Sequence, residues 1–384
     1  MTLSIGEDKC ARMKVVGVGG AGGNAINRMI SAQLDGVEFI AVNTDVQALK
    51  LSQAPQKVQI GNNLTRGLGT GGDPKLGRQA IEEDRDQMAE LLKDTDMVFL
   101  TAGMGGGTGT GASPVIAELA KEEGALTVAI VTKPFIFEGA KRMRCADEGI
   151  AELKERVDTL IVIPNQRLLS LVAKETPLTD AFKVADTMLS QATKGISDLI
   201  TVPGLINLDF NDVKAVMLET GDALMGVGIG RGDNRAVEAA QQAIRCPLLE
   251  NASISGAKGI LVNISGGENM TLYEINDATT VIYEEAGNGA NIILGAVIDE
   301  KMEDEIRVTV IATGLNNTAT RTSSLEGRSR ILPRGKPWSV DVPTFIRNQR
   351  GSKHQGLLDK QTISTSVSEE LELPSLLDEL EEEK

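Results

Sequence analysis

A run of glycines and threonines at residues 105–111 (Gly-Gly-Gly-Thr-Gly-Thr-Gly) follows a predicted strand and precedes a predicted helix. The apolar stretch 96–102 has the composition of a buried strand, and helical spacing of apolar residues begins near Ser113. Glycines let backbone N–H groups approach phosphate oxygens, threonines supply hydroxyls, and a helix N-terminus adds partial positive charge. This order predicts an anion site, because a flexible linker would not be flanked by two regular elements. The Gly-Lys-Ser/Thr ending of a P-loop is missing from the pattern.

Glycine-rich or polar segments recur through the first half of the chain, at the ends of predicted strands or before predicted helices. These segments are 19–24, 43–45, 66–74, 133–139 and 164–165. The predicted strands are 12–18, 37–42, 96–102, 126–132 and 159–163, and the predicted helices include 24–34 and 75–92. Alone, the first glycine turn is a weak sign of dinucleotide binding, and Thr44 or Asp45 is an equally good helix cap. Strands that alternate with helices predict a parallel α/β sheet that binds one nucleotide at the carboxyl ends of its strands.

The texture of the sequence changes after a long predicted helix at 178–200, which Pro203 and Gly204 stop. Phe182 and Asp186 are four residues apart and share one face of this helix, where a core aromatic and a solvated acid are the alternative interpretation. Beyond the helix, the pattern predicts a smaller α+β domain without phosphate loops. Its predicted strands are 224–229, 259–264, 291–298 and 306–312, and its predicted helices are 233–244 and 271–285.

The ends of the chain lack the apolar periodicity of a folded domain. Asn, Thr, Ser and Gly dominate after residue 314, which predicts disorder, and Trp338 opens a short segment typical of a docking peptide. The acidic end is a solvated tail or a second amphipathic binding helix. The predicted parts are a flexible N-terminus (1–11), a nucleotide-binding domain (12–176), a central helix (177–203), a second domain (204–314), a disordered linker (315–337), a partner-binding peptide (338–350) and an acidic tail (351–384).

Composition excludes several classes of function. The single histidine, His354, lies in the polar tail, so histidine-based acid–base catalysis and histidine metal sites are disfavoured. A formal net charge of -15 argues against a general nucleic-acid binder. Three scattered cysteines fit neither a disulfide framework nor a zinc site, and no apolar run reaches the ~18 residues of a membrane span. With no visible signal peptide, we expect a cytoplasmic protein.

Taken together, the motifs resemble those of the tubulin/FtsZ family of GTPases, and within it the bacterial cell-division proteins. The resemblance covers about residues 13–312 and rests on segments that occur in family order. These segments are 20–25 (Gly-Ala-Gly-Gly-Asn-Ala), 43–45 (Asn-Thr-Asp), 105–111, 134–139 (Pro-Phe-Ile-Phe-Glu-Gly) and 207–213 (Asn-Leu-Asp-Phe-Asn-Asp-Val). It implies an α/β fold in which a Rossmann-like, parallel-sheet GTP-binding domain is joined by a long central helix to a smaller α+β domain, with a disordered C-terminal tail.

The resemblance also implies which residues hold GTP or GDP. Glu138 would bind the ribose hydroxyls, Arg142 would lie near the phosphates, Asn165 and Asp186 would bond the guanine edge, and Phe182 would stack on the base. The remaining implied nucleotide-binding residues are Gly20, Ala21, Gly22, Gly23, Asn24, Asn43, Thr44, Gly71, Gly72, Gly105, Gly106, Gly107, Thr108, Gly109, Thr110, Gly111 and Pro134. One departure concerns Asp73, which adds negative charge near the expected phosphates.

Two carboxylates stand out in the second domain. Asp209 and Asp212 are three residues apart at a predicted helix start, so both can face one way, and helix capping is the alternative interpretation. The resemblance implies that Asn207, Asp209 and Asp212 act on the nucleotide of the next subunit in a head-to-tail filament. Mg²⁺ would be held mainly by the nucleotide phosphates and not by a protein metal site.

A tail peptide is the expected binding site for other proteins. By resemblance, Asp341, Val342, Pro343, Phe345, Ile346 and Arg347 would bind membrane-tether and division-regulator proteins. Contact with the membrane would then be indirect, no nucleic acid would be bound directly, and the protein would act in the mid-cell division ring. The alternatives are a nucleotide-binding oxidoreductase, a tubulin-like filament that moves DNA, and a scaffold that does not hydrolyse nucleotide.

Overall fold

The computed structural model describes residues 11–171, 176–202, 204–206, 208–249, 254–287, 289–299 and 301–315. The predicted flexible N-terminus (except Ala11), Asn207, the partner-binding peptide and the acidic tail lie outside these residues, as does all of the predicted linker after Leu315. For those segments the expectations from the sequence stay predictions.

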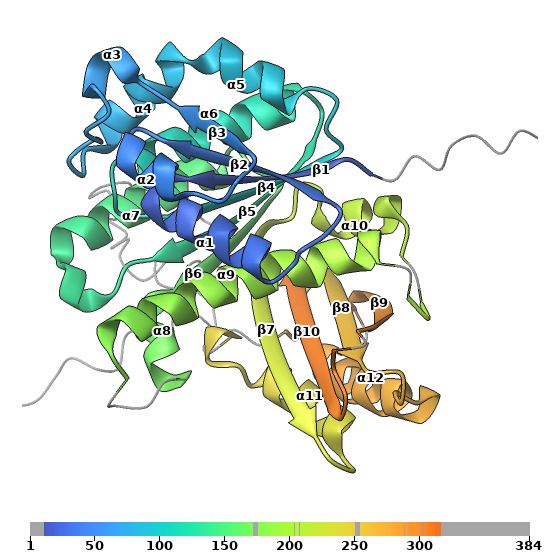
Figure 1. Cartoon of the computed structure of the whole chain (residues 1–384). Helices are drawn as coiled ribbons and strands as arrows, with labels where there is room; N and C mark the ends of the chain where they lie inside the picture. Colours follow the sequence, from blue (N-terminus) through green and yellow to red (C-terminus); the bar gives the residue numbers. More distant parts are fainter. Residues whose placement is uncertain are drawn as a thin grey trace, which may run out of the picture. The chain divides into compact units, whose positions relative to one another are not determined.

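Ten strands form a single sheet in the order β3-β2-β1-β4-β5-β6-β7-β10-β8-β9 (Figure 1). Neighbours from β3 to β7 pair in parallel, β10 is antiparallel to both of its neighbours, and β8 is parallel to β9. The strands are β1 (Met13–Val18), β2 (Val37–Asn43), β3 (Gln56–Gln59), β4 (Met97–Gly103), β5 (Leu126–Lys133), β6 (Thr159–Pro164), β7 (Gly221–Arg231), β8 (Gly259–Gly266), β9 (Asn291–Ile298) and β10 (Glu305–Thr313).

Helices connect the parallel strands and cover the sheet. The α-helices are α1 (Gly19–Ser31), α2 (Val46–Leu51), α3 (Asn62–Thr65), α4 (Pro74–Glu83), α5 (Arg85–Leu92), α6 (Thr108–Glu122), α7 (Ala140–Lys154), α8 (Asn165–Leu168), α9 (Leu178–Thr201), α10 (Phe210–Met217), α11 (Arg235–Ile244) and α12 (Leu272–Ala286). Three 3₁₀ turns are η1 (Ile136–Glu138), η2 (Leu169–Leu171) and η3 (Pro247–Leu249). Within the described ranges, no helix is both long and apolar enough to cross a membrane.

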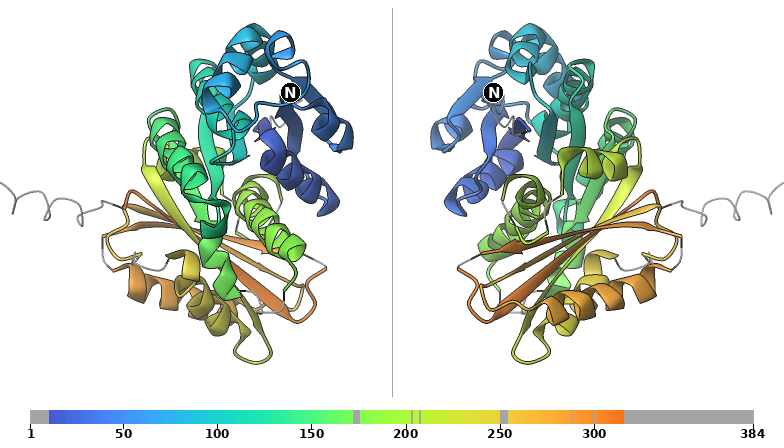
Figure 2. Two further views of the ribbon diagram at one scale, coloured as in Figure 1. Left: turned by 90° about the vertical axis from the view of Figure 1, so that its left-hand side faces the viewer. Right: turned by 90° about the vertical axis from the view of Figure 1, so that its right-hand side faces the viewer.

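The two faces of the sheet bury separate hydrophobic cores. Successive strand residues point to opposite faces, so Val15 packs with α1 and α9, and Val16 packs with the helices of the other face. Ile26 and Leu189 belong to the first core, and Ile116 belongs to the second. Figure 2 shows helices on both faces of the first half of the sheet. Continuous apolar strands between two helical layers are what a buried parallel sheet requires.

Strand order fixes where a ligand can bind. The chain order reverses between β1 and β4, because β2 and β3 lie on one side of β1 while β5 and β6 lie beyond β4. In open α/β sheets the helices on either side of such a reversal leave a crevice beyond the carboxyl ends of the strands. Both glycine loops that dominate the sequence, at residues 19–24 and 105–111, begin at this point.

The second half of the chain continues the same sheet. Helix α9 runs along the molecule from the carboxyl edge of the parallel strands to α10 (Figure 1). Strand β7 then pairs with β6 over Gly221–Ala223, and with β10 over its full length. The predicted fold class is confirmed: a Rossmann-like parallel-sheet domain, a long central helix and a smaller α+β part.

Three predicted helix boundaries are wrong. Helix α1 begins at Gly19 and not near Asn24, and α6 begins at Thr108 and not near Ser113. Glycines have poor intrinsic helix propensity, which misled the sequence reading, but packing against the strands overrides propensity. The helix predicted at 75–92 is two helices that meet at Asp84, whose carboxylate accepts a hydrogen bond from Gly61 N–H at 2.7 Å. The glycine and threonine loops are therefore partly first turns of helices.

Candidate functional site

A cavity of about 450 Å³ lies at the point where the strand order reverses. Its walls come from the turns after β1 and β4, from the segment around η1, and from α8 and α9. The predicted site residues that line it are Gly20, Ala21, Asn24, Gly105, Gly106, Gly107, Thr108, Gly109, Pro134, Glu138, Arg142, Asn165, Phe182 and Asp186. Residues that are up to 166 positions apart in sequence, from Gly20 to Asp186, thus meet in one cavity.

The other predicted nucleotide-binding residues do not line this cavity. They are Gly22, Gly23, Asn43, Thr44, Gly71, Gly72, Thr110 and Gly111. Several of them support its walls instead: the hydroxyls of Thr44 and Thr108 are 2.7 Å apart, and Thr110 Oγ1 accepts a hydrogen bond from Gly105 N–H at 2.8 Å. Asp45 caps α2 by accepting from Gln47 N–H, as the capping interpretation of this segment anticipated.

Two helices begin at the cavity without a side-chain cap. Neither α1 nor α6 has an acidic residue in its first turn, and their N-cap residues, Val18 and Gly107, give no side-chain hydrogen bond to the first N–H groups. Uncapped helix N-termini carry partial positive charge and free N–H donors, so the pair suits an anion with several oxygens. A Cβ atom built at Gly20 or Gly106 meets nothing within 4 Å, which leaves room for such an anion.

The loops that hold these helix starts are tightly packed elsewhere. A Cβ atom at Gly22 would lie 2.5 Å from the carbonyl oxygen of Thr101, and one at Gly107 would lie 2.0 Å from Thr70 Oγ1. Gly105 adopts φ +95°, a conformation that side chains disfavour. Some glycines are therefore needed for close packing, and others border open space.

The far end of the cavity presents an aromatic ring and two acceptors. Phe182 is 38% exposed, and its ring meets Phe135 edge to face with centroids 5.3 Å apart. Burial raises the pKa of the Asp186 carboxyl to about 6, although the positive charge of Arg28 opposes this shift. Asn165 is 5% exposed, and its buried Oδ1 has no hydrogen-bond partner among the described residues. A buried acceptor without a partner indicates that a donor from a ligand belongs there.

An ion pair closes one side of the cavity. Glu138 accepts hydrogen bonds from Phe135 N–H at 2.9 Å and from the Arg142 guanidinium at 2.6 Å. The Glu138 side chain is 13% exposed and that of Arg142 is 57% exposed, so the arginine can reorient at little cost. The pair brings one carboxylate and one exposed cation to the rim of the cavity.

Asp209 and Asp212 lie far from this cavity. Both are exposed, and both follow the C-terminal end of α9, whereas Phe182 and Asp186 lie near its N-terminal end (Figure 1). A helix of 24 residues is about 36 Å long at 1.5 Å per residue. Asp209 caps α10 by accepting from Asp212 N–H at 2.8 Å, so the capping interpretation holds for Asp209. The two carboxylates cannot reach the cavity of their own chain.

Sequence reasoning missed two hydroxyls at the cavity and did not explain one acid. Thr70 and Thr132 line the cavity, and Thr70 Oγ1 lies 3.4 Å from Thr108 Oγ1. Thr70 lies in the glycine-rich segment 66–74 and Thr132 lies near the end of a predicted strand, so both positions could have been predicted as parts of the site. Asp73 accepts from Lys75 N–H at 2.9 Å as the cap of α4, which explains an acid in this loop. Among the residues described, no group of three or more His, Cys, Asp or Glu is placed to hold a metal ion.

Comparisons with known proteins cover most of the chain. Residues 12–173 match the model of the Tubulin/FtsZ family GTPase domain, and residues 221–316 match that of the FtsZ family C-terminal domain. The chain is similar to an empty FtsZ dimer from M. jannaschii, with 47% identity and a TM-score of 0.77 over 80% of this chain and 89% of that one. A point mutant of FtsZ from the same organism gives the same identity and TM-score, over 80% of this chain and 92% of that one. A GTPγS-bound CetZ2 protofilament from Haloferax volcanii shares the fold at 20% identity, with a TM-score of 0.69 over 82% and 96%.

Proposed function

The chain belongs to the tubulin/FtsZ family of GTPases, and from this premise we propose that it hydrolyses GTP at sites completed between successive subunits of a head-to-tail filament. The observation that carries the proposal is the separation of Asp209 and Asp212 from the cavity by the length of α9. A cavity that binds nucleotide at one end of a subunit and a carboxylate pair at the other end are complementary halves of one active site. Stacking in one direction joins them, in a heterologous contact that does not close.

The cavity suits GTP in a defined orientation. Its uncapped helix starts at Gly19 and Thr108 would hold the phosphates, and Glu138 would accept from the ribose hydroxyls once Arg142 turns to the phosphates. Phe182 would stack on the base. Asp186 would accept from both the ring N–H and the amino group of guanine, which adenine cannot offer together.

Binding of guanine nucleotide should weaken in acid because of Asp186. Its carboxyl, with a pKa of about 6 in the empty site, must be ionised to accept two guanine donors. Below pH 6 the neutral form dominates, so we expect the Kd of GDP to rise about tenfold from pH 7 to pH 5. Titration calorimetry across this range would measure it. In the Asp186→Asn variant only ionisation of the GDP phosphates should still change the Kd with pH, so its Kd should depend less on pH than that of wild type. The same dependence of Kd on pH in both proteins would contradict the assignment.

The chemistry at the joined site is mainly positioning. Asp212 would orient and polarise the attacking water against the terminal phosphate bound to the neighbouring subunit. Asp209 is held beside it, because its carboxylate accepts a hydrogen bond from Asp212 N–H. Mg²⁺, held mainly by the phosphates, would supply neutralisation of the developing charge. No histidine and no P-loop lysine is needed for this mechanism.

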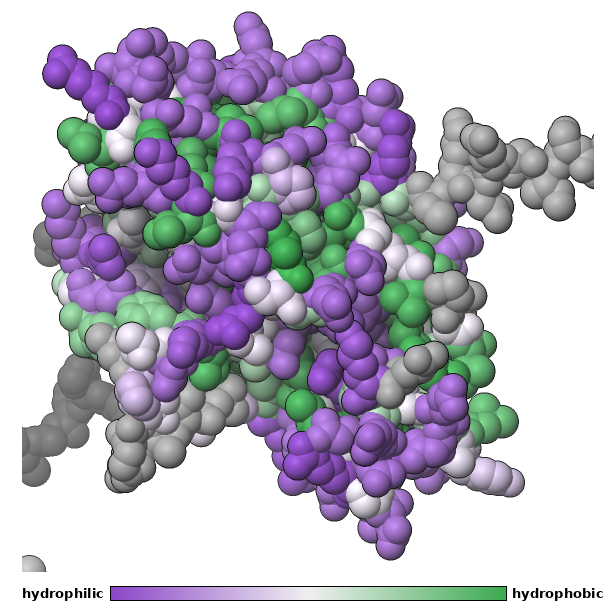
Figure 3. Space-filling view, viewed as in Figure 1, coloured by the Kyte–Doolittle hydropathy of each residue, from purple (hydrophilic) through white to green (hydrophobic). Residues whose placement is uncertain are grey.

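Exposed apolar side chains lie beside the cavity and beside the carboxylate pair, where two successive subunits would contact each other. Leu68, next to the loop that carries Thr70, is exposed, and so are Leu205 and Ile206 before α10. Hydrophobic surface gathers on the side of the molecule where α10 and β9 lie (Figure 3). The N–H of Leu205 donates to Ala296 O of β9 at 2.9 Å, which holds this segment against the sheet. Exposed apolar patches of this kind are typical of protein–protein contacts.

The rate of GTP hydrolysis per subunit should depend on protein concentration. If two subunits build each site, the rate is near zero below a threshold concentration and rises with light scattering above it, with Mg²⁺ present throughout. Measuring phosphate release and scattering on the same samples tests this relation. A rate per subunit that does not change with concentration would mean that each chain carries a whole site.

We further propose that these filaments form a division ring at mid-cell in the cytoplasm, tethered to the membrane through the peptide 341–347. Support for this role comes from the sequence of that peptide and from the likeness to FtsZ. A filament that moves DNA is the main alternative. Deleting residues 338–350 should abolish capture of the chain by membrane-tether proteins in a pull-down and leave GTP hydrolysis intact. Unchanged capture would count against the division role.

A further inference from the structure

Strand β7 has a free edge along most of its length. On one side it pairs with β10 from Ala223 to Arg231, and on the other it pairs with β6 only over Gly221–Ala223. Among the described residues, no strand pairs with 224–231 on the β6 side. In an antiparallel pair, alternate residues direct their N–H and C=O groups away from the partner strand. A free edge with such groups is a template for another strand.

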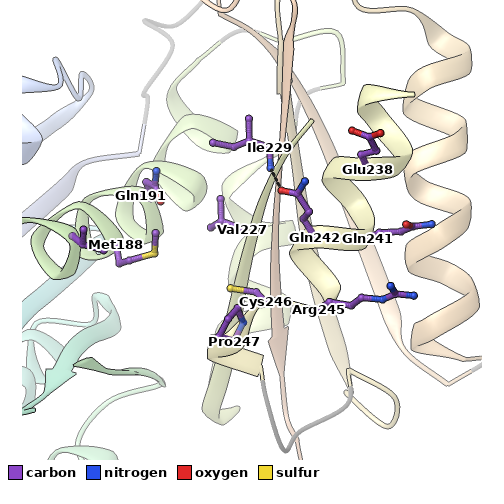
Figure 4. A pocket seen from close by; sticks show the side chains of 11 residues that line it. Met188, Gln191, Val227, Ile229, Glu238, Gln241, Gln242, Arg245, Cys246 and Pro247 are labelled. Atoms are coloured by element: carbon purple, nitrogen blue, oxygen red, sulfur yellow. Dashed lines mark hydrogen bonds between the residues drawn. The ribbon is translucent and has the colours of Figure 1, made fainter. Parts of the chain in front are cut away.

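The orientation of the free groups follows from one hydrogen bond. Ile229 N–H donates to Gln242 Oε1 of α11 at 3.3 Å, which directs it away from β10 and toward the free edge (Figure 4). Val227, two residues earlier, directs its N–H to the same edge because the period of a strand is two. Gln242 thus occupies, with one side-chain amide, the place that a neighbouring strand would take.

A groove of about 630 Å³ lies along this edge. One wall is apolar, formed by Val184 and Met188 of α9 together with the side chains of Val227 and Ile229. The other wall is polar and belongs mainly to α11. Its members are Glu238, Gln241, Gln242 and Arg245. Figure 4 shows Met188 of α9 on one side, Val227 and Ile229 of β7 in the middle, and the polar side chains of α11 on the other side.

Two polar side chains in the groove lack a partner among the residues that the structure describes. Arg245 is exposed and forms no ion pair with any described residue. Gln191 Oε1 is buried on the α9 side and has no hydrogen-bond partner in the part of the chain that the structure describes. Buried acceptors are nearly always paired in complete structures, so a donor is expected to enter this groove.

We propose that the groove binds an extended segment of a partner protein, which adds a strand to the free edge of β7. The segment alternates apolar side chains, which face Val184 and Met188, with polar ones, which face α11. One of the polar side chains is acidic and pairs with Arg245. Its backbone bonds to Val227 and displaces Gln242 from Ile229. This site is independent of the GTPase proposal, since none of its residues lines the nucleotide cavity.

A second folded copy of the chain does not suit this groove. The edge of β7 is recessed between α9 on one face of the sheet and α11 on the other, and an equal edge on another copy would be recessed in the same way. A single extended segment is thin enough to enter, since a strand needs about 4.8 Å of space in the pairing direction. Strand addition with alternating pockets is an established mode of peptide recognition.

The test is selection of random phage-displayed octapeptides against the full chain, with the Arg245→Glu variant as counter-target. The matched control is Lys57→Glu, which makes the same charge change at an exposed site on β3, the edge strand at the other end of the sheet. Selected peptides should alternate apolar and polar residues and contain an acid. Arg245→Glu should weaken their binding roughly tenfold, Lys57→Glu should not, and exchanging the acid of the peptide for lysine should restore binding to Arg245→Glu.

Hydrogen exchange gives a second readout that identifies the edge. On peptide binding, the Val227 amide should exchange about tenfold more slowly, while amides of β7 that already bond β10 should not change. The proposal is overturned if no peptide is selected, if the selected peptides bind wild type and Arg245→Glu equally, or if Val227 exchange is unaffected. Unchanged unfolding temperatures would establish that both charge variants are folded.

Discussion

Asp212→Asn should lower the rate of GTP hydrolysis by about 10²- to 10⁴-fold and leave GTP binding intact. Asp212 is exposed and lies beyond the C-terminal end of α9, so its removal cannot disturb the cavity at the other end of the same helix. An amide keeps the shape of the side chain but loses the charge that orients and polarises water. Phosphate release at saturating GTP and Mg²⁺, together with GTP affinity, measures both parts of the prediction.

Mixing experiments separate action on the neighbour from action within one chain. Asp212→Asn subunits should enter wild-type filaments and lower the rate of the mixture below the value expected from dilution. Asp277→Asn is the matched control, because Asp277 is an exposed acid on α12 that lies outside the proposed site. Simple additivity in the mixture, or normal turnover by Asp212→Asn alone, would refute the shared active site.

Alanine at two adjacent glycines should affect different properties, nucleotide affinity at Gly106 and folding stability at Gly107. A Cβ at Gly106 meets open space in the cavity, so Gly106→Ala should fold normally and fill volume that the phosphates need. Overpacking costs about 1–3 kcal/mol, which corresponds to a loss of GDP affinity of about 5- to 150-fold. A Cβ at Gly107 would lie 2.0 Å from Thr70 Oγ1 and 2.9 Å from Asp73 N, so Gly107→Ala should destabilise the protein even without nucleotide.

Two measurements distinguish these outcomes. Thermal unfolding of nucleotide-free protein should show a lower midpoint for Gly107→Ala and a midpoint near that of wild type for Gly106→Ala. GDP affinity should fall for Gly106→Ala despite its normal stability. Wild-type affinity in Gly106→Ala would mean that the phosphates do not approach this part of the loop.

The sequence predicts the parallel strands well because each strand is specified by a short run of neighbouring residues. Apolar runs such as the one before Gly105 specify buried parallel strands, and polar segments at their ends converge because parallel strands share an edge. The helix starts at Gly19 and Thr108 were each predicted about five residues too late, since packing and not propensity decides them.

Other features depend on contacts between distant residues. Phe182 has the helical spacing of a core residue, and only the tertiary structure shows it exposed at the cavity. The continuation of the first sheet through β7 has no signal in either strand sequence. The roles given to Asn165 and Asp186 came from the family resemblance, and the unpaired Asn165 Oδ1 and the raised pKa of Asp186 add independent physical support.

The joint between β6 and β7 has a mechanical meaning. It consists of three residue pairs, Thr159–Ile161 with Gly221–Ala223, whereas β7 and β10 pair over nine. A sheet bends most easily where two of its strands share the fewest residue pairs, so bending strain concentrates at the contact between β6 and β7. Helix α9 packs against β5 and β6 on one side of this joint and against β8 and β9 on the other, so it connects the two parts of the sheet and resists bending between them. The resistance of the molecule to bending under load therefore depends less on its hydrophobic cores than on the packing of α9 against the two parts of the sheet.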